Sequence, residues 1–291
     1  MFRTSTLLSV GLMAALASSA ASAATRNVVF LNNPSPQDVK DVGHYLVKST
    51  GKPFFSELVL FAANINGTSA NSPVLGYNSE MTAILDKNID AVRALQKLGI
   101  RVQISYLGNH QQAGWSCNMT AKTAGKLGDA MVAAVVKYDL DGINVDDEYS
   151  KCSGYPKAFY NVLKAIKANT YFSGKTLSKA LWSDSSYFNS PSNAADHLSE
   201  GYEMTYAGSV DNLTPYVGYG MKKDNLYLGI SPEFTPASGV RSVAASVVSG
   251  GYRGVMVWAP TAFLDQAGAA QYYSEIVKAQ VGTSESVEFV P

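Results

Sequence analysis

The chain has 291 residues, no formal net charge at pH 7 and a hydrophobic content of 46%. This composition suits a globular core, and the balanced charge excludes the basic surfaces typical of proteins that bind nucleic acid or anionic membranes. Two cysteines and three histidines are too few for a spaced metal cluster, so we expect neither a metal nor another cofactor.

Residues 1–23 have the pattern of a secretory signal peptide. Arg3 supplies a positive charge, and the apolar run at residues 6–17 is too short to span a bilayer. Small residues at 21–23 form a cleavage site. An uncleaved membrane anchor is the alternative, but small residues follow the run where a stop-transfer pattern would be needed. We expect a secreted protein, cleaved near Ala23 and not held in a membrane.

From residue 24 onward, strand-like apolar segments alternate with amphipathic helices. The expected strands lie at 27–33, 57–66, 100–107, 140–145, 177–181, 201–206, 226–230 and 254–258. The expected helices lie at 81–98, 120–138, 155–168 and 267–281. This alternation predicts an α/β protein, a single (β/α)8 TIM barrel over residues 24–282. The connections around strands five to seven are short and rich in Ser, Asn and Pro, so the ring of helices is expected to be incomplete there. Residues 283–291 are expected to be a disordered tail.

The fourth strand continues into the acidic sequence DGINVDDE at residues 141–148. Because side chains alternate between the two faces of a strand, its apolar residues should face the surrounding helices. Asn144, Asp146 and Glu148 then point into the barrel, toward the carboxyl end where barrel enzymes keep their active sites. We therefore identify Asp146 and Glu148 as candidate catalytic residues.

The chemistry of two neighbouring carboxyls supports that identification. Side chains two residues apart on a strand lie roughly 6.5–7 Å apart, close enough to couple. Crowding in a partly buried site raises the pKa of at least one carboxyl, as a general acid requires. The alternative is a solvated acidic turn, which is disfavoured because inward polar residues are costly without a use.

The sequence DGINVDDE resembles the DGxDxDxE signature of glycoside hydrolase family 18. The segments FAANIN (61–66), LGNHQQAGW (107–115) and KYDLDGINVDDEY (137–149) are similar to those of the endo-β-N-acetylglucosaminidase H type, in the same order and spacing. The sequences MTY (204–206) and VMVW (255–258) resemble later strand motifs of family 18. The resemblance implies a barrel that hydrolyses glycosidic bonds.

The resemblance also implies roles for individual residues. Members of the family are retaining enzymes in which the substrate's own 2-acetamido group replaces an enzyme nucleophile. Glu148 is then the general acid and later the base, and Asp146 orients the acetamide. Tyr206 would donate to the acetamide oxygen, although a plain core tyrosine is the alternative for this residue.

Other residues are expected to bind the sugar. Trp258 would form the floor of the sugar subsite, with core packing as its alternative, and Met204 belongs to the MTY motif. Asn64 and Asn109 follow strands two and three and would line the cleft, unless they only cap loops.

Asn144 departs from the family signature, which has Asp at this position. The resemblance places residue 144 beneath the catalytic pair, where an Asn can still donate a hydrogen bond to Asp146 but cannot carry charge. We expect an altered titration of the pair and a reduced activity, with the acid Glu148 retained.

Cys117 and Cys152 are expected to form a disulfide. They lie in the loops after strands three and four, which are neighbours on the catalytic face of a parallel barrel, and an exported protein meets oxidising conditions. Two free thiols are the alternative.

These observations favour an endo-β-N-acetylglucosaminidase that hydrolyses the β-1,4 bond of the di-N-acetylchitobiose core of N-linked glycans, with the high-mannose type expected. Its partners would be the N-glycans of glycoproteins, and we expect a monomer. A chitinase and a non-catalytic lectin-like or inhibitor protein are the alternatives. LGNHQQAGW and the lack of an aromatic-rich insertion disfavour the chitinase, and the presence of Glu148 disfavours the non-catalytic protein.

Overall fold

The structure is a computed structural model, and it describes residues 25–291. The signal peptide expected at residues 1–23 lies outside the described residues. Within the described part of the chain, no helix is both long and apolar enough to cross a membrane.

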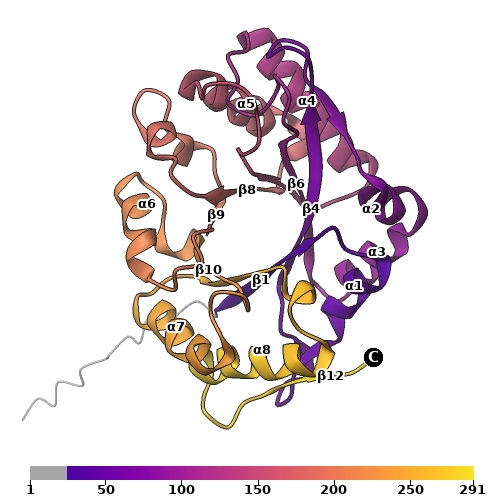
Figure 1. The fold of residues 1–291 in the computed structure, drawn as a ribbon, viewed down its shortest axis with the longest axis vertical. Helices are drawn as coiled ribbons and strands as arrows, with labels where there is room; N and C mark the ends of the chain where they lie inside the picture. Colours follow the sequence, from indigo (N-terminus) through magenta and orange to yellow (C-terminus); the bar gives the residue numbers. More distant parts are fainter. Residues whose placement is uncertain (1–24) are drawn as a thin grey trace, which may run out of the picture.

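Eight parallel strands form a closed barrel (Figure 1). Closure occurs at β1, which pairs in parallel with β4 on one side and with β11 on the other. The strands are β1 (Arg26–Asn32), β4 (Glu57–Asn66), β6 (Arg101–Gly108), β7 (Gly142–Val145), β8 (Thr176–Leu181), β9 (Glu200–Glu203), β10 (Leu226–Ile230) and β11 (Gly254–Trp258). A short antiparallel strand, β5 (Val74–Gly76), extends the edge of β4. The predicted TIM barrel is therefore confirmed.

The two faces of the barrel strands carry different side chains. Ile143 and Val145 of β7 belong to the large apolar cluster between the strands and the helices. Phe30, Tyr202 and Met256 belong to a smaller cluster inside the barrel. The face assignment made from the alternation along β7 is thus confirmed.

The helices cover most of the outside of the barrel. They are α1 (Pro36–Asp41), α2 (Ser79–Thr82), α3 (Ile89–Lys97), α4 (Ala121–Lys137), α5 (Pro156–Ala168), α6 (Thr214–Gly218), α7 (Ala237–Ser249) and α8 (Gln266–Gln280). The single helix expected at 81–98 is wrong, because a π-helical turn (Ala83–Lys87) separates α2 from α3. There the Asn88 amide donates to the Ala83 carbonyl over 2.8 Å and competes with the regular helical pattern.

The ring of helices has a gap on one side. Only 3₁₀ turns (Ser185–Phe188 and Ala194–Asp196) follow β8, and a 3₁₀ turn (Val210–Leu213) with the five-residue α6 follows β9. Figure 1 draws the segment between α5 and α6 largely as loop and short turns. The incomplete ring is confirmed after strands five and six. It is wrong after strand seven, where the full helix α7 follows.

The carboxyl-terminal segment is ordered, so the disordered tail expected at 283–291 is wrong. Strand β12 (Val287–Phe289) pairs antiparallel with β2 (Tyr45–Val47), which also pairs with β3 (Lys52–Pro53). Val287 is buried, and its backbone N–H donates to the Ser274 hydroxyl of α8 over 2.8 Å. The expectation failed because β12 is held by segments that are distant in sequence.

A network of polar side chains fills the amino-terminal end of the barrel. Arg101 forms ion pairs with Glu57 and Glu200, the latter at 2.7 Å. Gln103 donates to Glu57 and to the Tyr202 hydroxyl. The Tyr202 hydroxyl in turn donates to Glu200 over 2.7 Å. These bonds satisfy polar and charged groups that would otherwise be costly to bury.

Candidate active site

A cavity of about 390 Å³ opens at the carboxyl ends of the barrel strands. It contains Asp146 and Glu148 after β7, Met204 and Tyr206 after β9, and Trp258 at the end of β11. The lining is Phe30, Asn32, Phe61, Asp146, Glu148, Tyr149, Ala180, Met204, Tyr206, Met256 and Trp258. The structure therefore brings five of the expected site residues together from three different strands.

Asp146 is the more deeply buried of the two carboxyls, at 3% exposure. Its backbone N–H donates to the Tyr106 carbonyl over 3.1 Å, which fixes the strand end beside β6. Burial raises the pKa of Asp146 well above its ordinary value, and the charge of Glu148 and hydrogen bonding to Glu148 raise it further. Asp146 Oδ1 is buried without a hydrogen-bond partner in the described part of the chain. This oxygen is free to receive a donor from a ligand.

Asn144 lies beneath the pair and is fully buried. Its Oδ1 accepts from the Ser105 hydroxyl over 2.8 Å, and its Nδ2 donates to the Ser178 hydroxyl over 2.9 Å. The amide is therefore held by two serines on neighbouring strands. The expected hydrogen bond from Asn144 to Asp146 is not formed, and Asn144 does not line the cavity.

The loop that carries Glu148 is fastened to the loop after β6. Gly108 N–H donates to the Glu148 carbonyl over 2.9 Å, and His110 N–H donates to the Tyr149 carbonyl over 2.6 Å. A side chain at Gly108 would collide with the Glu148 backbone, since its Cβ would lie 2.5 Å from that carbonyl oxygen. The Trp115 indole donates to the Tyr106 carbonyl over 2.6 Å from a fully buried position. The segment LGNHQQAGW thus supports the catalytic loop.

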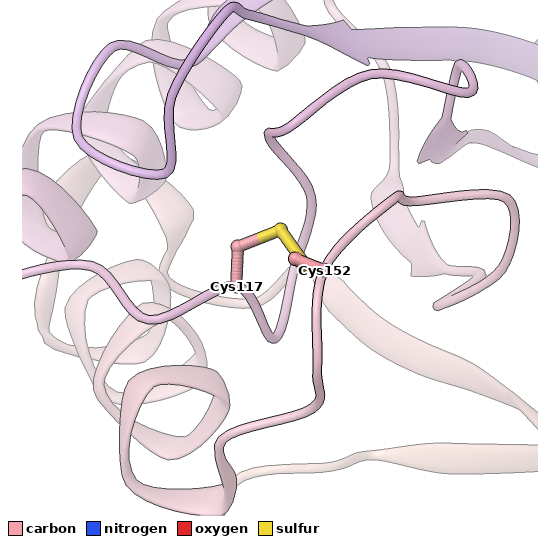
Figure 2. Close-up of a disulfide and its surroundings, with 2 residues drawn as sticks. All are labelled: Cys117 and Cys152. Atoms are coloured by element: carbon pink, nitrogen blue, oxygen red, sulfur yellow. A yellow bond between two sulfur atoms is a disulfide. The ribbon is translucent and has the colours of Figure 1, made fainter.

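A disulfide joins the same two loops. Cys117 and Cys152 are bonded, with their Cα atoms 5.5 Å apart, and Figure 2 shows the link between the two loop segments. The expected disulfide is confirmed.

Aromatic rings form one wall of the cavity. Tyr206 stacks on Trp258 with ring centroids 6.1 Å apart and an interplanar angle of 29°, and it stacks on Phe234 at 6.1 Å and 9°. Tyr206 has a left-handed backbone with φ of 57°, a conformation uncommon for a bulky residue. Burial raises the pKa of Tyr206, and the charges of Asp146, Glu203 and Glu148 add to the effect. Its hydroxyl therefore stays protonated and able to donate.

Asn64 and Asn109 do not line this cavity. Asn64 is half-buried and its Nδ2 lies 3.4 Å from the Gly108 carbonyl, whereas the exposed Asn109 donates to Asn66 over 2.8 Å. The expectation that they line the cleft is therefore wrong, and both side chains brace loops instead.

The sequence did not single out several lining residues. Phe30 and Asn32 alternate inward along β1, Phe61 lies within FAANIN, and Tyr149 directly follows the acid. A period-two pattern could have suggested the first two. Ala180 and Met256 carry no polar group, so only the closed barrel reveals their place.

The chain is similar to known endo-β-N-acetylglucosaminidases. No family model matches it. It is 41% identical over 110 residues to an endo-β-N-acetylglucosaminidase of Flavobacterium sp. (strain SK1022), covering 38% of this chain and 34% of that protein. It is 30% identical over 230 residues to endo-β-N-acetylglucosaminidase F1 of Elizabethkingia meningoseptica, covering 74% of this chain and 66% of that protein. The matched region thus spans about a third of the length of the Flavobacterium protein and 66% of the length of the Elizabethkingia protein.

Solved structures share the fold. EndoBT-3987 of Bacteroides thetaiotamicron, solved with a Man5GlcNAc product, superposes with a TM-score of 0.73 at 19% identity, covering 91% of this chain and 62% of that chain. A GH18 chitinase of Pseudoalteromonas aurantia superposes with a TM-score of 0.62 at 14% identity, covering 88% of this chain and 100% of the chitinase chain. The relatives, the barrel and the acidic strand end together show that the chain belongs to glycoside hydrolase family 18, in the group of the endo-β-N-acetylglucosaminidases.

Proposed function

We propose that the protein is an endo-β-N-acetylglucosaminidase that cleaves the β-1,4 bond of the di-N-acetylchitobiose core of N-linked glycans. The observation that carries this proposal is the cavity in which buried Asp146 lies beside Glu148, against Tyr206 and Trp258. Among the described lining residues there is no third carboxyl to serve as a separate nucleophile. EndoBT-3987 was also solved with a Man9GlcNAc2Asn substrate, which supports high-mannose glycans as the substrate class.

The first step of the proposed reaction uses the sugar's own acetamide. Glu148 donates its proton to the glycosidic oxygen as the bond to the anomeric carbon breaks. The acetamide oxygen attacks that carbon and forms an oxazolinium ion, while the acetamide N–H donates to the unpartnered Oδ1 of Asp146. The Tyr206 hydroxyl donates to the acetamide oxygen and holds it near the reacting carbon.

The second step reverses the roles. Water attacks the anomeric carbon, the carboxylate of Glu148 takes the proton of the water, and the acetamide ring reopens. Two inversions at one carbon give net retention, with one N-acetylglucosamine left on the protein acceptor.

We also propose that the protein is secreted, acts on glycoproteins outside the cell and does so as a monomer. The signal-like sequence at residues 1–23 and the disulfide support export, because such bonds persist in oxidising compartments.

Replacement of the acid tests the proposed function. We expect Glu148→Gln to lower kcat by roughly 10²–10⁴-fold, because it removes the proton donor with little change in shape. Mass spectrometry of products from a high-mannose glycoprotein measures the loss. Colloidal chitin, assayed in parallel with the wild-type protein, identifies a chitinase if it alone is cleaved. Wild-type turnover by the folded variant would contradict the role of Glu148, and inactivity of the wild-type protein on both substrates would favour a non-catalytic binding protein.

A further inference from the structure

The outer faces of β8 and β9 differ from those of the other barrel strands. On β11, for example, Val255 and Val257 face outward and pack in the apolar cluster beneath the helices. On β8 and β9, the outward positions next to the gap in the helical ring carry Lys179 and Glu203. Both side chains are buried. Buried charges at an uncovered part of the barrel are costly and call for a role.

Two of the charges in this region satisfy each other. Lys179 forms an ion pair with Asp184 and donates to the Ala180 carbonyl over 2.7 Å. Asp184 also accepts from the Tyr216 hydroxyl over 2.7 Å. The cation is therefore fully engaged by its own neighbours.

Glu203 has no such ion pair. It is 1% exposed, and its Oε1 accepts from the Thr205 backbone N–H over 2.8 Å and from the Asn212 amide over 3.4 Å. Its Oε2 is buried beside the backbone of Gly229 on β10. Glu203 thus positions Asn212, while its second carboxylate oxygen is held out of solvent against β10.

These side chains line a second cavity, of about 330 Å³. Its lining is Leu181, Trp182, Ser183, Asp184, Ser185, Glu203, Thr205, Asp211, Asn212, Pro215, Tyr216 and Tyr219. Trp182 is 51% exposed. The two cavities are neighbours at the carboxyl ends of β8 and β9. Ala180 and Met204 line the catalytic cavity, and the next residues in the chain, Leu181 and Thr205, line the second one.

We propose that this second cavity is a carbohydrate-binding site that takes a neutral hexose from a branch of the glycan held in the active site. An exposed indole offers a flat apolar surface for the C–H face of a sugar, and amide and carboxylate groups bind its hydroxyls. The carboxyls at Asp211, Asp184 and Glu203 disfavour acidic sugars, since the described lining contains no lysine or arginine and the neighbouring Lys179 is paired with Asp184. This inference rests on the proposed function and adds a specificity-determining site to it.

Calorimetric titration of the Glu148→Gln protein, which leaves the ligand intact, tests the site. The two ligands are Man9GlcNAc2Asn and the branchless core GlcNAc2Asn. We expect Trp182→Ala to raise the Kd for Man9GlcNAc2Asn about tenfold more than the Kd for GlcNAc2Asn, the effect of one buried aromatic contact. Asn212→Ala should likewise raise the Kd for Man9GlcNAc2Asn more than the Kd for GlcNAc2Asn, by about threefold.

Tyr171→Ala is the matched control, because Tyr171 is a 73% exposed aromatic residue in the turn before β8, at the opposite end of the barrel. It should change neither Kd. If the branched and core ligands lose affinity equally, or not at all, in both folded variants, the second site is refuted while the proposed function stands. If the Glu148→Gln parent binds neither ligand, the proposed function and the second site fail together.

Discussion

At the scale of single residues, Asn144 distinguishes this site from the family signature. The amide is neutral and is held between Ser105 and Ser178, so residue 144 places no third charge beneath Asp146 and Glu148. The raised pKa of Asp146 therefore comes from burial first and from Glu148 second.

Asn144→Asp should move the basic limb of the pH–rate profile to higher pH. A carboxyl added on the same strand face disfavours ionisation of its neighbours, so the acid keeps its proton to a higher pH and the group titrates as one system. KM should change by less than about twofold, since residue 144 lies below the sugar. Asn109→Asp, which adds a carboxyl outside the cavity, is the control. Overlapping profiles for wild type and Asn144→Asp would show that residue 144 is not coupled to the pair.

Much of the residue-level site could be predicted because its chemistry is local in sequence. Asp146 and Glu148 are two residues apart on one strand, so a period-two pattern places them together. Asn64 and Asn109 were misplaced, because a strand end alone does not say whether an amide faces the cleft or a neighbouring loop. Phe30 contacts the site only through barrel closure, which no local pattern encodes.

At the scale of elements, the loops after β6 and β7 act as one unit, joined by backbone hydrogen bonds and by the Cys117–Cys152 bond. The sequence indicated this pairing because adjacent parallel strands bring their loops side by side. It did not indicate α7, because the helix is rich in Ser and Ala, and the buried face formed by Val240, Ala244 and Val247 is not obvious in its sequence.

The double variant Cys117→Ser/Cys152→Ser should lose about 3–4 kcal/mol of unfolding free energy, as expected for opening a cross-link across 35 residues. Denaturant titration measures the loss. The unreduced, unfolded wild-type protein should show no reactive thiol. Equal midpoints for the two proteins would show that the bond does not stabilise the fold.

Val287→Ala in β12 should cost about 1–3 kcal/mol, because the buried side chain leaves a cavity against α8 and β2. Val290→Ala, at a 45% exposed position just after the strand, should stay within about 0.5 kcal/mol of wild type. Thermal unfolding of both variants separates the two cases. Equal losses of unfolding free energy in the two variants would mean that burial of Val287 in β12 does not stabilise the fold.

At the scale of the whole molecule, the polar network at the base of the barrel links stability to pH. Burial raises the pKa of Glu57 from 4.5 to about 8, and repulsion from Glu200 adds to the shift, while Arg101 and Gln103 oppose it. The pKa of Glu57 is higher in the folded protein than in the unfolded chain. The contribution of protonated Glu57 to the free energy of unfolding is therefore complete below about pH 4.5. It is lost as the pH rises through about 8.

Glu57→Gln removes this titration and keeps the size of the side chain. The difference in unfolding free energy, wild type minus variant, should therefore decrease as the pH rises from about 5 to about 9, a range that brackets the titration. Denaturant titrations at intervals of one pH unit give the difference. A pH-independent difference would contradict the raised pKa.

Closure of the barrel also sets an order of events during synthesis. The first strand needs a partner at residues 254–258, so the ring stays open until the ribosome has added more than two hundred further residues. At about 5–20 residues per second this takes on the order of 10–50 s, during which one edge of β1 has no strand beside it. The carboxyl-terminal segment that contains β11 therefore decides when the barrel closes.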